Sequence, residues 1–231
     1  MAIETSSCWS CGDMRAAHFC QACGKVQPPL PVDYFTFFGL QRKLNVNVAR
    51  LEREFYELSR KLHPDLNARA DKREQEWSLE QSSLLNDAYR TLKDPIKRTQ
   101  YLLGLEGVVL EEQSKSATEK ARAAGEVKKQ IVPPDLLEEV FELNMQLEEA
   151  RMNRKMGEDD PALLKELEEQ EIRFEKKHEE LSQELKGHWD KWDKAAEEQE
   201  RREALDAMVD LLNRRSYIRN LVRDVNEALG N

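Results

Sequence analysis

A helical repeat of apolar residues, interrupted at proline, is the feature that most constrains the fold of this chain. Apolar side chains recur at steps of three and four over residues 48–62, and the pattern stops at Pro64. Proline disfavours helical geometry at the residue before it, so we expect this helix to end there. A second apolar stripe covers residues 77–92, and a short helix is expected over residues 96–103. Two long helices joined by a loop predict an antiparallel helical hairpin.

The C-terminal part of the chain, residues 133–231, consists almost entirely of helix-forming residues. Three apolar stripes separated by polar breaks predict a three-helix bundle. We expect its second helix to begin with Asp160 as the N-cap and Pro161 in the first turn. We expect its third helix to begin near Trp189 and Trp192, which would pack at the end of the bundle.

These patterns predict an all-α protein made of four segments. Residues 1–31 carry all four cysteines, residues 32–107 contain the hairpin, residues 108–132 form a polar linker, and residues 133–231 form the bundle. Charged residues make up 35% of the chain and aromatic residues only 7%, a balance that suits amphipathic helices with solvated outer faces.

Charge and hydropathy exclude several classes of protein. The formal net charge of −9 argues against a general nucleic-acid-binding protein, which needs cations to displace counterions from phosphates. The sequence contains no apolar run of about 18 residues, so we expect no membrane-spanning helix. The first residues, MAIETSS, do not resemble a secretory signal or an amphipathic presequence. We therefore expect a cytoplasmic protein, and the alternative is a mitochondrial matrix or plastid protein after processing.

The cysteines follow the spacing C-x2-C-x8-C-x2-C, and they are Cys8, Cys11, Cys20 and Cys23. Two residues between thiolates allow both sulfurs to reach one ion from a single turn. The glycines that follow each pair, Gly12 and Gly24, can take the left-handed backbone conformation that such a turn requires. Two turns of this kind predict a closed, tetrahedral four-thiolate site without an open position for a substrate. We expect a structural zinc ion that supplies the fold of this short segment.

Other interpretations of the cysteines are an iron site of rubredoxin type, a redox dithiol and a pair of disulfides. Disulfides are disfavoured because the sequence carries no secretory signal. We expect His18 to be a surface neighbour of the metal site, since four thiolates already complete the coordination shell.

The stretch His63-Pro64-Asp65 joins the two helices of the hairpin and has three interpretations. A catalytic pair would require a nucleophile, and no serine, cysteine or glycine-rich nucleophile turn lies next to it in the sequence. In a structural interpretation, Pro64 ends a helix and Asp65 caps a turn. In a recognition interpretation, the loop contacts another protein.

The order of features over residues 33–107 resembles the J-domain, the module by which DnaJ-type proteins stimulate DnaK-type chaperone ATPases. Three stretches carry the resemblance: DYFTFFGL, ARLEREFYELSRKLHPD and LLNDAYRTLKDP. The resemblance implies that His63, Pro64 and Asp65 contact the chaperone and trigger its ATP hydrolysis without performing chemistry themselves.

Four basic residues of the helix before this loop lie largely off its apolar stripe, and they are Arg50, Arg53, Arg60 and Lys61. A basic helix face suits electrostatic steering toward an acidic partner surface. The alternative is an ordinary solvated face. The adjacent His-Pro-Asp loop leads us to assign these residues to chaperone binding.

The stretch RTQYLLGLEGV at residues 98–108, followed by a linker and an acidic helical bundle, resembles the HscB family of J-type co-chaperones of iron–sulfur cluster assembly. A pair of cysteine knuckles ahead of the J-domain is similar to what the longer, eukaryotic-type members carry. The resemblance implies that the bundle holds an IscU-type scaffold protein and delivers it to an HscA-type chaperone. The contact residues that it implies are Leu137, Phe141, Glu142, Met145 and Tyr217.

This sequence departs from the family pattern at Glu138 and Met145, where the pattern has a hydrophobic and an acidic residue respectively. Helix geometry separates contact from core in the same helix. Phe141 and Leu143 project about 200° apart at about 3.6 residues per turn, so both cannot be equally buried. We expect Leu143, like Leu136 and Val140, to be in the core.

We therefore expect a non-enzymatic co-chaperone with an ATPase partner, a scaffold partner and a structural zinc ion. The first alternative is a general J-domain protein with another client. A second is a zinc-ribbon regulatory or interaction protein with a helical dimerisation region, which the negative charge disfavours. A hydrolase with a His–Asp pair ranks last, because no nucleophile for it is evident in the sequence. A homodimer is an arrangement that the sequence allows.

Overall fold

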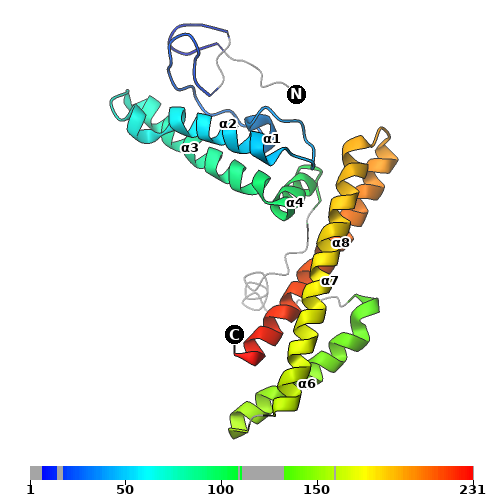
Figure 1. Cartoon of the computed structure of the whole chain (residues 1–231). Coiled ribbons are helices and arrows are strands. Elements are labelled where there is room, and N and C mark those ends of the chain that lie inside the picture. Colours follow the sequence, from blue (N-terminus) through cyan, green and yellow to red (C-terminus); the bar gives the residue numbers. More distant parts are fainter. Residues whose placement is uncertain (1–6, 15–17, 109, 111–132, 159, 231) are drawn as a thin grey trace, which may run out of the picture. The chain divides into compact units, whose positions relative to one another are not determined.

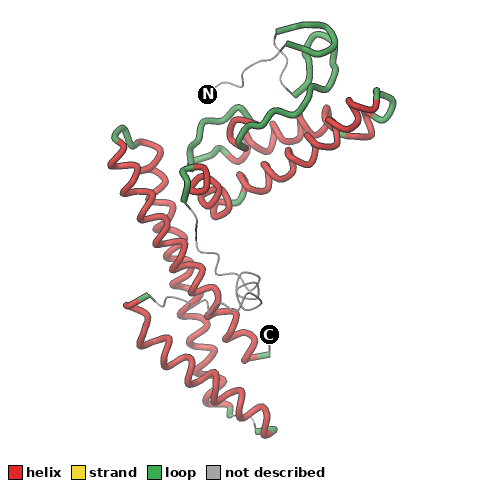
Figure 2. Tube along the Cα trace, turned by 180° about the vertical axis from the view of Figure 1, so that it is seen from behind, coloured by secondary structure: helices red, strands yellow, loops and turns green. Residues whose placement is uncertain are grey.

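The computed structural model describes residues 7–14, 18–108, 110, 133–158 and 160–230. The linker predicted over residues 108–132 lies almost entirely outside the described residues. Contacts divide the chain into two units, Met1–Val108 and Val109–Asn231. Figure 2 shows that the regular elements of the described residues are helices, which confirms the all-α fold class. Among these residues no helix is long and apolar enough to cross a membrane.

The first unit contains α1 (Tyr34–Phe37), α2 (Val48–Leu62), the 3-10 turn η1 (Pro64–Asn67), α3 (Lys72–Lys93) and α4 (Pro95–Leu105). Figure 1 shows α2 and α3 side by side, joined by the loop that contains η1. The predicted hairpin is therefore present, with α2 ending before the proline. The fourth helix continues through its glycine and is slightly longer than predicted.

Polar side chains fix where these helices begin. The Asn47 side chain accepts a hydrogen bond from the backbone N–H of Arg50 at 2.9 Å, and Asp71 accepts one from Glu74 at 3.0 Å. Asp94 accepts two at the start of α4. Each contact satisfies an N–H group that has no partner within the helix.

Apolar side chains from all four helices form the core of this unit. The largest fully buried ones are Phe35, Leu44, Leu51, Leu62, Leu85, Leu92, Leu102 and Leu103. The hairpin is also joined at its open end, where Phe55 stacks on Tyr89 at 4.1 Å between ring centroids. The Tyr89 hydroxyl donates to Glu52 at 2.9 Å. The hairpin thus presents its loop from a rigid pair of helices.

The second unit consists of η2 (Pro134–Leu136), α6 (Leu137–Met156), α7 (Pro161–Lys194) and α8 (Glu198–Leu229). Figure 1 shows α7 and α8 as a long hairpin, with α6 lying along only part of its length. The three-helix bundle is therefore confirmed.

The predicted start of the third helix near Trp189 and Trp192 is wrong. Both residues lie in the last turns of α7, where they are buried between α7 and α8 near the end of that hairpin. The preceding Gly187 does not end the helix, because one glycine costs only about 1 kcal/mol relative to alanine. The break comes instead at residues 195–197, where Glu197 and Glu200 form a capping box that starts α8.

The core of the bundle combines residues from α6, α7 and α8 with the end of η2. Its buried members are Leu136, Val140, Leu143, Leu147, Leu167, Phe174, Tyr217, Ile218, Leu221 and Val225. An ion pair between Lys177 and Glu139 joins α7 to α6 at the edge of this core. The core covers one face of α6 and leaves the opposite face to solvent.

The N-cap of α7 gives a stability prediction. Asp160 accepts hydrogen bonds from the backbone N–H groups of Ala162 at 2.9 Å and Leu163 at 3.2 Å, as predicted. We expect Asp160→Ala to lower the free energy of unfolding of the bundle by about 1 kcal/mol. Chemical denaturation followed by the helical circular dichroism signal measures this. Asp160→Asn retains a capping oxygen and should stay within about 0.5 kcal/mol of the wild type; equal losses in both variants would contradict the capping role.

Candidate functional site

The His-Pro-Asp loop is held in place through its backbone. The carbonyl of Leu62, the last residue of α2, accepts hydrogen bonds from the hydroxyls of Ser78 at 2.8 Å and Ser82 at 2.6 Å. The amide of Asn67 donates to the carbonyl of His63 at 3.1 Å and to the Ser78 hydroxyl at 3.2 Å. These bonds fasten both ends of the loop to one face of α3.

The side chains of the loop point to solvent. His63 accepts a hydrogen bond at Nδ1 from the backbone N–H of Asp65 at 3.2 Å, so His63 rather than Asp65 caps the turn that Pro64 begins. The Asp65 side chain is 90% exposed and lies 3.7 Å from His63 Nδ1. The carboxylate and the imidazole are therefore both accessible to a partner molecule.

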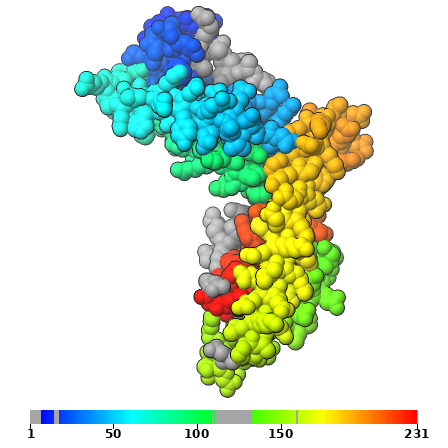
Figure 3. Space-filling view, in the orientation of Figure 1, coloured from blue at the N-terminus to red at the C-terminus, as the bar shows by residue number. Residues whose placement is uncertain are grey.

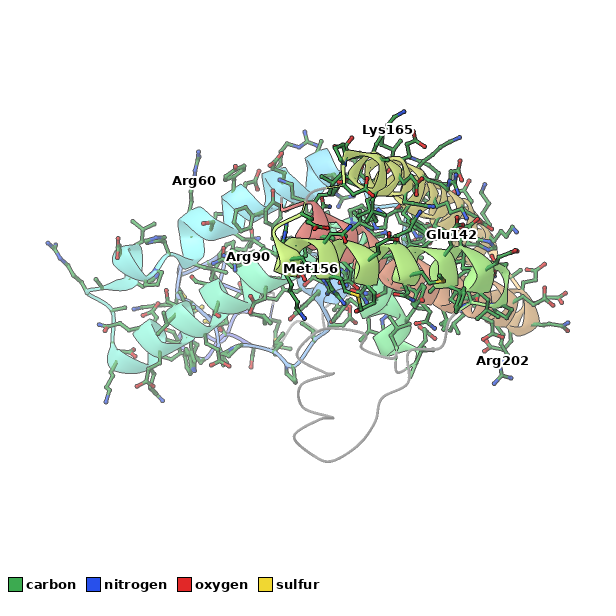
Figure 4. All side chains as sticks on the ribbon, turned by 90° about the horizontal axis from the view of Figure 1, so that it is seen from below. Arg60, Arg90, Glu142, Met156, Lys165 and Arg202 are labelled. Carbon is green, nitrogen blue, oxygen red and sulfur yellow. The ribbon has the colours of Figure 1, made fainter. Side chains whose placement is uncertain are left out.

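The four predicted basic residues of α2, Arg50, Arg53, Arg60 and Lys61, are all exposed. Figure 4 shows Arg60 projecting away from α3. Lys61 has a second contact that the sequence did not predict. Its ammonium group lies over the ring of Phe19, 4.4 Å from the ring centroid.

The four cysteines meet at one point. Their sulfur atoms all lie within 4.8 Å of one another, and all four thiols are free. The Sγ atoms of Cys8 and Cys23 are 3.7 Å apart, and those of Cys11 and Cys20 are 3.6 Å apart. A tetrahedral ion with metal–sulfur bonds of about 2.3 Å holds its sulfurs about 3.8 Å apart. The cysteines therefore fit a four-thiolate metal site, and no disulfide bond joins them in this structure.

The backbone of the two cysteine turns has the left-handed glycine conformation that the sequence predicted. Gly12 and Gly24 have φ angles of 77° and 72°, in the left-handed region. Their N–H groups donate to the carbonyls of Cys8 and Cys20 at 2.9 and 2.8 Å. The N–H groups of residues 10 and 11 also point at the Cys8 sulfur, at 3.4 and 3.5 Å. The first of these two matching turns thus directs N–H groups at a sulfur, which favours negative charge on Cys8.

The pKa values of Cys8 and Cys11 are shifted in opposite directions within the cluster. Burial opposes ionisation of Cys8, but hydrogen bonds from the backbone of Cys11 and Ser10 lower its pKa to about 6. A backbone hydrogen bond from Asp13 favours ionisation of Cys11, but the neighbouring Cys20 thiol, burial and the other thiols raise its pKa to about 12. Four sulfurs at this spacing ionise together only when a cation compensates their repulsion. The donor set therefore fits a divalent metal ion.

The cysteine module, residues 7–14 and 18–27, packs against α3 in the same unit (Figure 3). His18 belongs to this contact. Its Nδ1 lies 3.0 Å from the Gln81 side-chain oxygen, and its Nε2 lies 2.9 Å from the carbonyl of Phe37. The expectation that His18 is a surface neighbour of the metal site is wrong, because the imidazole is half-buried between the module and the hairpin.

The outer face of α6 carries the exposed apolar residues predicted for scaffold contact. Leu137, Phe141 and Met145 are all exposed, Phe141 by 68%, whereas Leu143 is fully buried. Glu142 is exposed beside them. The same face continues to two further exposed methionines, Met152 and Met156. Figure 4 shows Glu142 and Met156 on separate parts of α6.

The expectation that Tyr217 is a surface contact is wrong. Its side chain is only 4% exposed and belongs to the bundle core. It shares one face of α8 with Leu221 and Val225, at steps of four residues, and this stripe faces the core. Burial also raises the pKa of the Tyr217 hydroxyl.

Sequence reasoning missed three residues of α3 that position the loop and the cysteine module. Glu74, Ser78 and Gln81 are polar and buried. The available signal was their spacing of four and three residues, which puts them on one helix face. That signal is ambiguous without the structure, because polar residues at these steps normally face solvent.

A model of the DnaJ domain matches residues 33–101 of this chain. Curated relatives are iron–sulfur cluster co-chaperone HscB proteins. The Arabidopsis thaliana homologue is 34% identical over 63% of this chain and 52% of its own length. The mouse protein is 39% identical over 46% and 47%, and the human protein 33% over 65% and 61%. The matches thus span about half to three fifths of the relatives.

Two solved structures have a similar fold. Human co-chaperone protein HscB matches with a TM-score of 0.64 and 24% identity over 95% of this chain and 96% of that one. Chaperone HscB from Vibrio cholerae matches with a TM-score of 0.53 and 24% identity over 85% and 96%. The order of a hairpin unit followed by a three-helix bundle is therefore shared with these proteins.

Proposed function

We propose that this chain is a member of the HscB family of J-domain proteins and a co-chaperone of iron–sulfur cluster assembly, which the DnaJ-domain match and the similarity to curated HscB proteins support. In this proposal it stimulates the ATPase of a DnaK/HscA-type chaperone and delivers an IscU-type scaffold protein to it. The chain performs no chemistry itself. Hydrolysis takes place in the chaperone, and the chain supplies the contacts that promote it.

The observation that carries the proposal is the exposure of the His-Pro-Asp loop on a rigid hairpin. His63 and Asp65 point to solvent, while their backbone is fastened to α3. A fixed loop loses little conformational freedom when it binds, so its polar groups can contribute to affinity for the chaperone. Arg50, Arg53 and Arg60 add a positive surface that speeds encounter with an acidic partner.

We assign scaffold binding to the outer face of α6. Leu137, Phe141 and Met145 supply apolar contact area, and Glu142 supplies a charged contact at its edge. Exposed aromatic and methionine side chains on a charged helix are typical of protein interfaces. α6 has apolar residues on two opposite faces, and the bundle core covers only one of them. The uncovered apolar face supports a role in binding.

We assign zinc to the four-cysteine site, where Cys8, Cys11, Cys20 and Cys23 would hold it. Zinc is the common occupant of closed four-thiolate sites, and when bound it would supply structural cross-linking rather than reactivity. Free thiols suit a reducing compartment, so we propose the cytoplasm or, after processing, a mitochondrial matrix or plastid. The segments 1–31, 32–107 and 133–231 would then serve metal binding, chaperone activation and scaffold binding.

The metal assignment gives a direct prediction. Cys20→Ser should lose the metal and loosen the module, because a structural site needs all four thiolates to close its shell. We expect about one zinc ion per wild-type chain by elemental analysis and almost none in the variant. Ser10→Ala, between Cys8 and Cys11 in the other cysteine turn, removes a side chain that is not a ligand and should retain the metal. Metal-free wild-type protein with an intact module would contradict the assignment.

Co-purification tests the choice of client. Tagged protein should retain an IscU-type scaffold and a DnaK-type chaperone after washing at moderate salt. Retention of the chaperone without the scaffold would favour a general J-domain protein with another client. Retention of neither would contradict the proposed function.

A further inference from the structure

The first half of α3 has a polar face that is buried. Glu74, Ser78 and Gln81 lie on this face and are each at most 2% exposed. Burying a charged or amide side chain is unfavourable unless hydrogen bonds replace its water. The hydrogen-bond partners of these residues therefore show which segments of the chain pack against this helix face.

One set of partners belongs to the cysteine module. The Glu74 carboxylate accepts a hydrogen bond from Lys25 Nζ at 2.7 Å and another from the backbone N–H of Val26 at 3.0 Å. The Gln81 amide donates to the carbonyl of Gln27 at 2.6 Å. These contacts dock the C-terminal half of the module onto α3.

The other set of partners belongs to the His-Pro-Asp loop. Ser78, between Glu74 and Gln81 on the same face, donates to the carbonyl of Leu62 and accepts from Asn67. The module and the loop are thus fastened to adjacent positions of one helix. A displacement of this helix segment changes both contacts together.

A direct contact also joins the module to the last turn of α2, next to the loop. The Lys61 ammonium lies 4.4 Å from the centre of the Phe19 ring, and Phe19 directly precedes the ligand Cys20. The Lys61 carbonyl lies 3.4 Å from the Asn67 amide that bridges the loop. A cation over an aromatic face is held with about 0.5–1 kcal/mol at an exposed site. Phe19 therefore restrains a basic residue two positions before His63.

We propose that the cysteine module positions the His-Pro-Asp loop and Lys61 for chaperone binding, with Glu74 and Phe19 as the positioning residues. This inference rests on the proposed function. The loop itself is short, exposed and made of one 3-10 turn, which places it among the segments of a protein that open most easily. Docking of the metal-bound module on α3 opposes that opening.

Glu74→Ala tests the inference while leaving all four cysteines in place. We expect the variant to keep its metal. Amide hydrogen exchange over residues 62–78 should become at least about tenfold faster, because a buried charge-assisted contact is lost. The concentration of protein that gives half-maximal chaperone stimulation should rise by a similar factor. Glu76→Ala makes the same charge change on an exposed face of α3 and should match the wild type.

Phe19→Leu provides a second test if Glu74→Ala folds poorly. Leucine keeps an apolar side chain but removes the aromatic face under Lys61, so half-maximal stimulation should require about two to five times more protein. Phe19→Tyr keeps the ring and should match the wild type.

The outcomes separate this inference from the proposed function. Wild-type protein that stimulates no DnaK-type chaperone contradicts the proposed function before any variant is examined. A wild type that stimulates, with unchanged loop exchange in Glu74→Ala, overturns the positioning role. Faster loop exchange with unchanged stimulation overturns it as well, because the loop would then work without the module.

Discussion

Asp65→Asn should reduce stimulation of the chaperone ATPase to the rate of the chaperone alone. The side chain is 90% exposed and its contact within the chain is a 3.7 Å approach to His63, so the fold should not change. Asparagine keeps the shape of the residue and removes the charge. Loss of one partner from a charged pair at an interface costs about 2–5 kcal/mol, a decrease of at least about 30-fold in affinity. ATP turnover at a fixed concentration of protein measures the loss.

The matched control for this variant is Asp87→Asn. Asp87 is exposed in the C-terminal half of α3, away from the loop, and the substitution makes the same change in net charge. It should stimulate as well as the wild type. Scaffold binding should be unchanged in both variants, because the α6 surface belongs to the other unit. Normal stimulation by Asp65→Asn would show that the loop does not engage the chaperone as proposed.

Phe141→Ala should weaken binding of an IscU-type scaffold by at least about 2 kcal/mol, or about 30-fold. The side chain is 68% exposed and contributes little to the bundle core, so the free energy of unfolding should change by less than about 0.5 kcal/mol. An aromatic residue among apolar neighbours on a helix face is the kind of residue that carries most of the binding energy at an interface. Titration calorimetry with the scaffold measures the affinity.

Ile172→Ala is the matched control for scaffold binding. Ile172 is 66% exposed on α7, so its truncation removes a similarly exposed apolar side chain from a different helix. Its affinity for the scaffold should equal that of the wild type. Similar losses in both variants, or none in Phe141→Ala, would place the scaffold contact elsewhere.

Helix boundaries could be predicted where a strong local signal ends the pattern. Pro64 and the Asp160-Pro161 pair act on the backbone of their own segment, so tertiary contacts do not override them. The end of α7 lacked such a signal. The helix continues past Gly187 to Lys194 because Trp189 and Trp192 are buried against α8, and that packing is not visible in the local sequence.

The residues of the candidate sites also divide into those that local sequence predicts and those whose placement depends on tertiary packing. The cysteine cluster could be predicted because spacing alone dictates that the four thiols converge. Phe141 and Leu143 could be assigned to opposite faces from helix geometry, and their exposures agree. Tyr217 could not be placed by resemblance, because an aromatic residue suits a core as well as an interface. Its burial is decided by the register of α8 against α6 and α7.

The docking of the cysteine module on α3 could not be predicted, because it depends on hydrogen bonds between residues about fifty positions apart. Glu74 looks like a solvated residue of an amphipathic helix until Lys25 and Val26 are placed against it. His18 likewise connects the cysteine module to the hairpin, because its imidazole lies against the side chain of Gln81. Local periodicity carries no information on such partners.

The ATPase rate of a DnaK/HscA-type chaperone, measured with and without this protein and then with the IscU-type scaffold added, tests the proposed co-chaperone function most directly. We expect this protein alone to raise the rate, and the scaffold to raise it further at concentrations where the scaffold alone has a smaller effect. An unchanged rate under both conditions, with folded and metal-loaded protein, would contradict the function proposed from the exposed His63-Pro64-Asp65 loop and the outer face of α6.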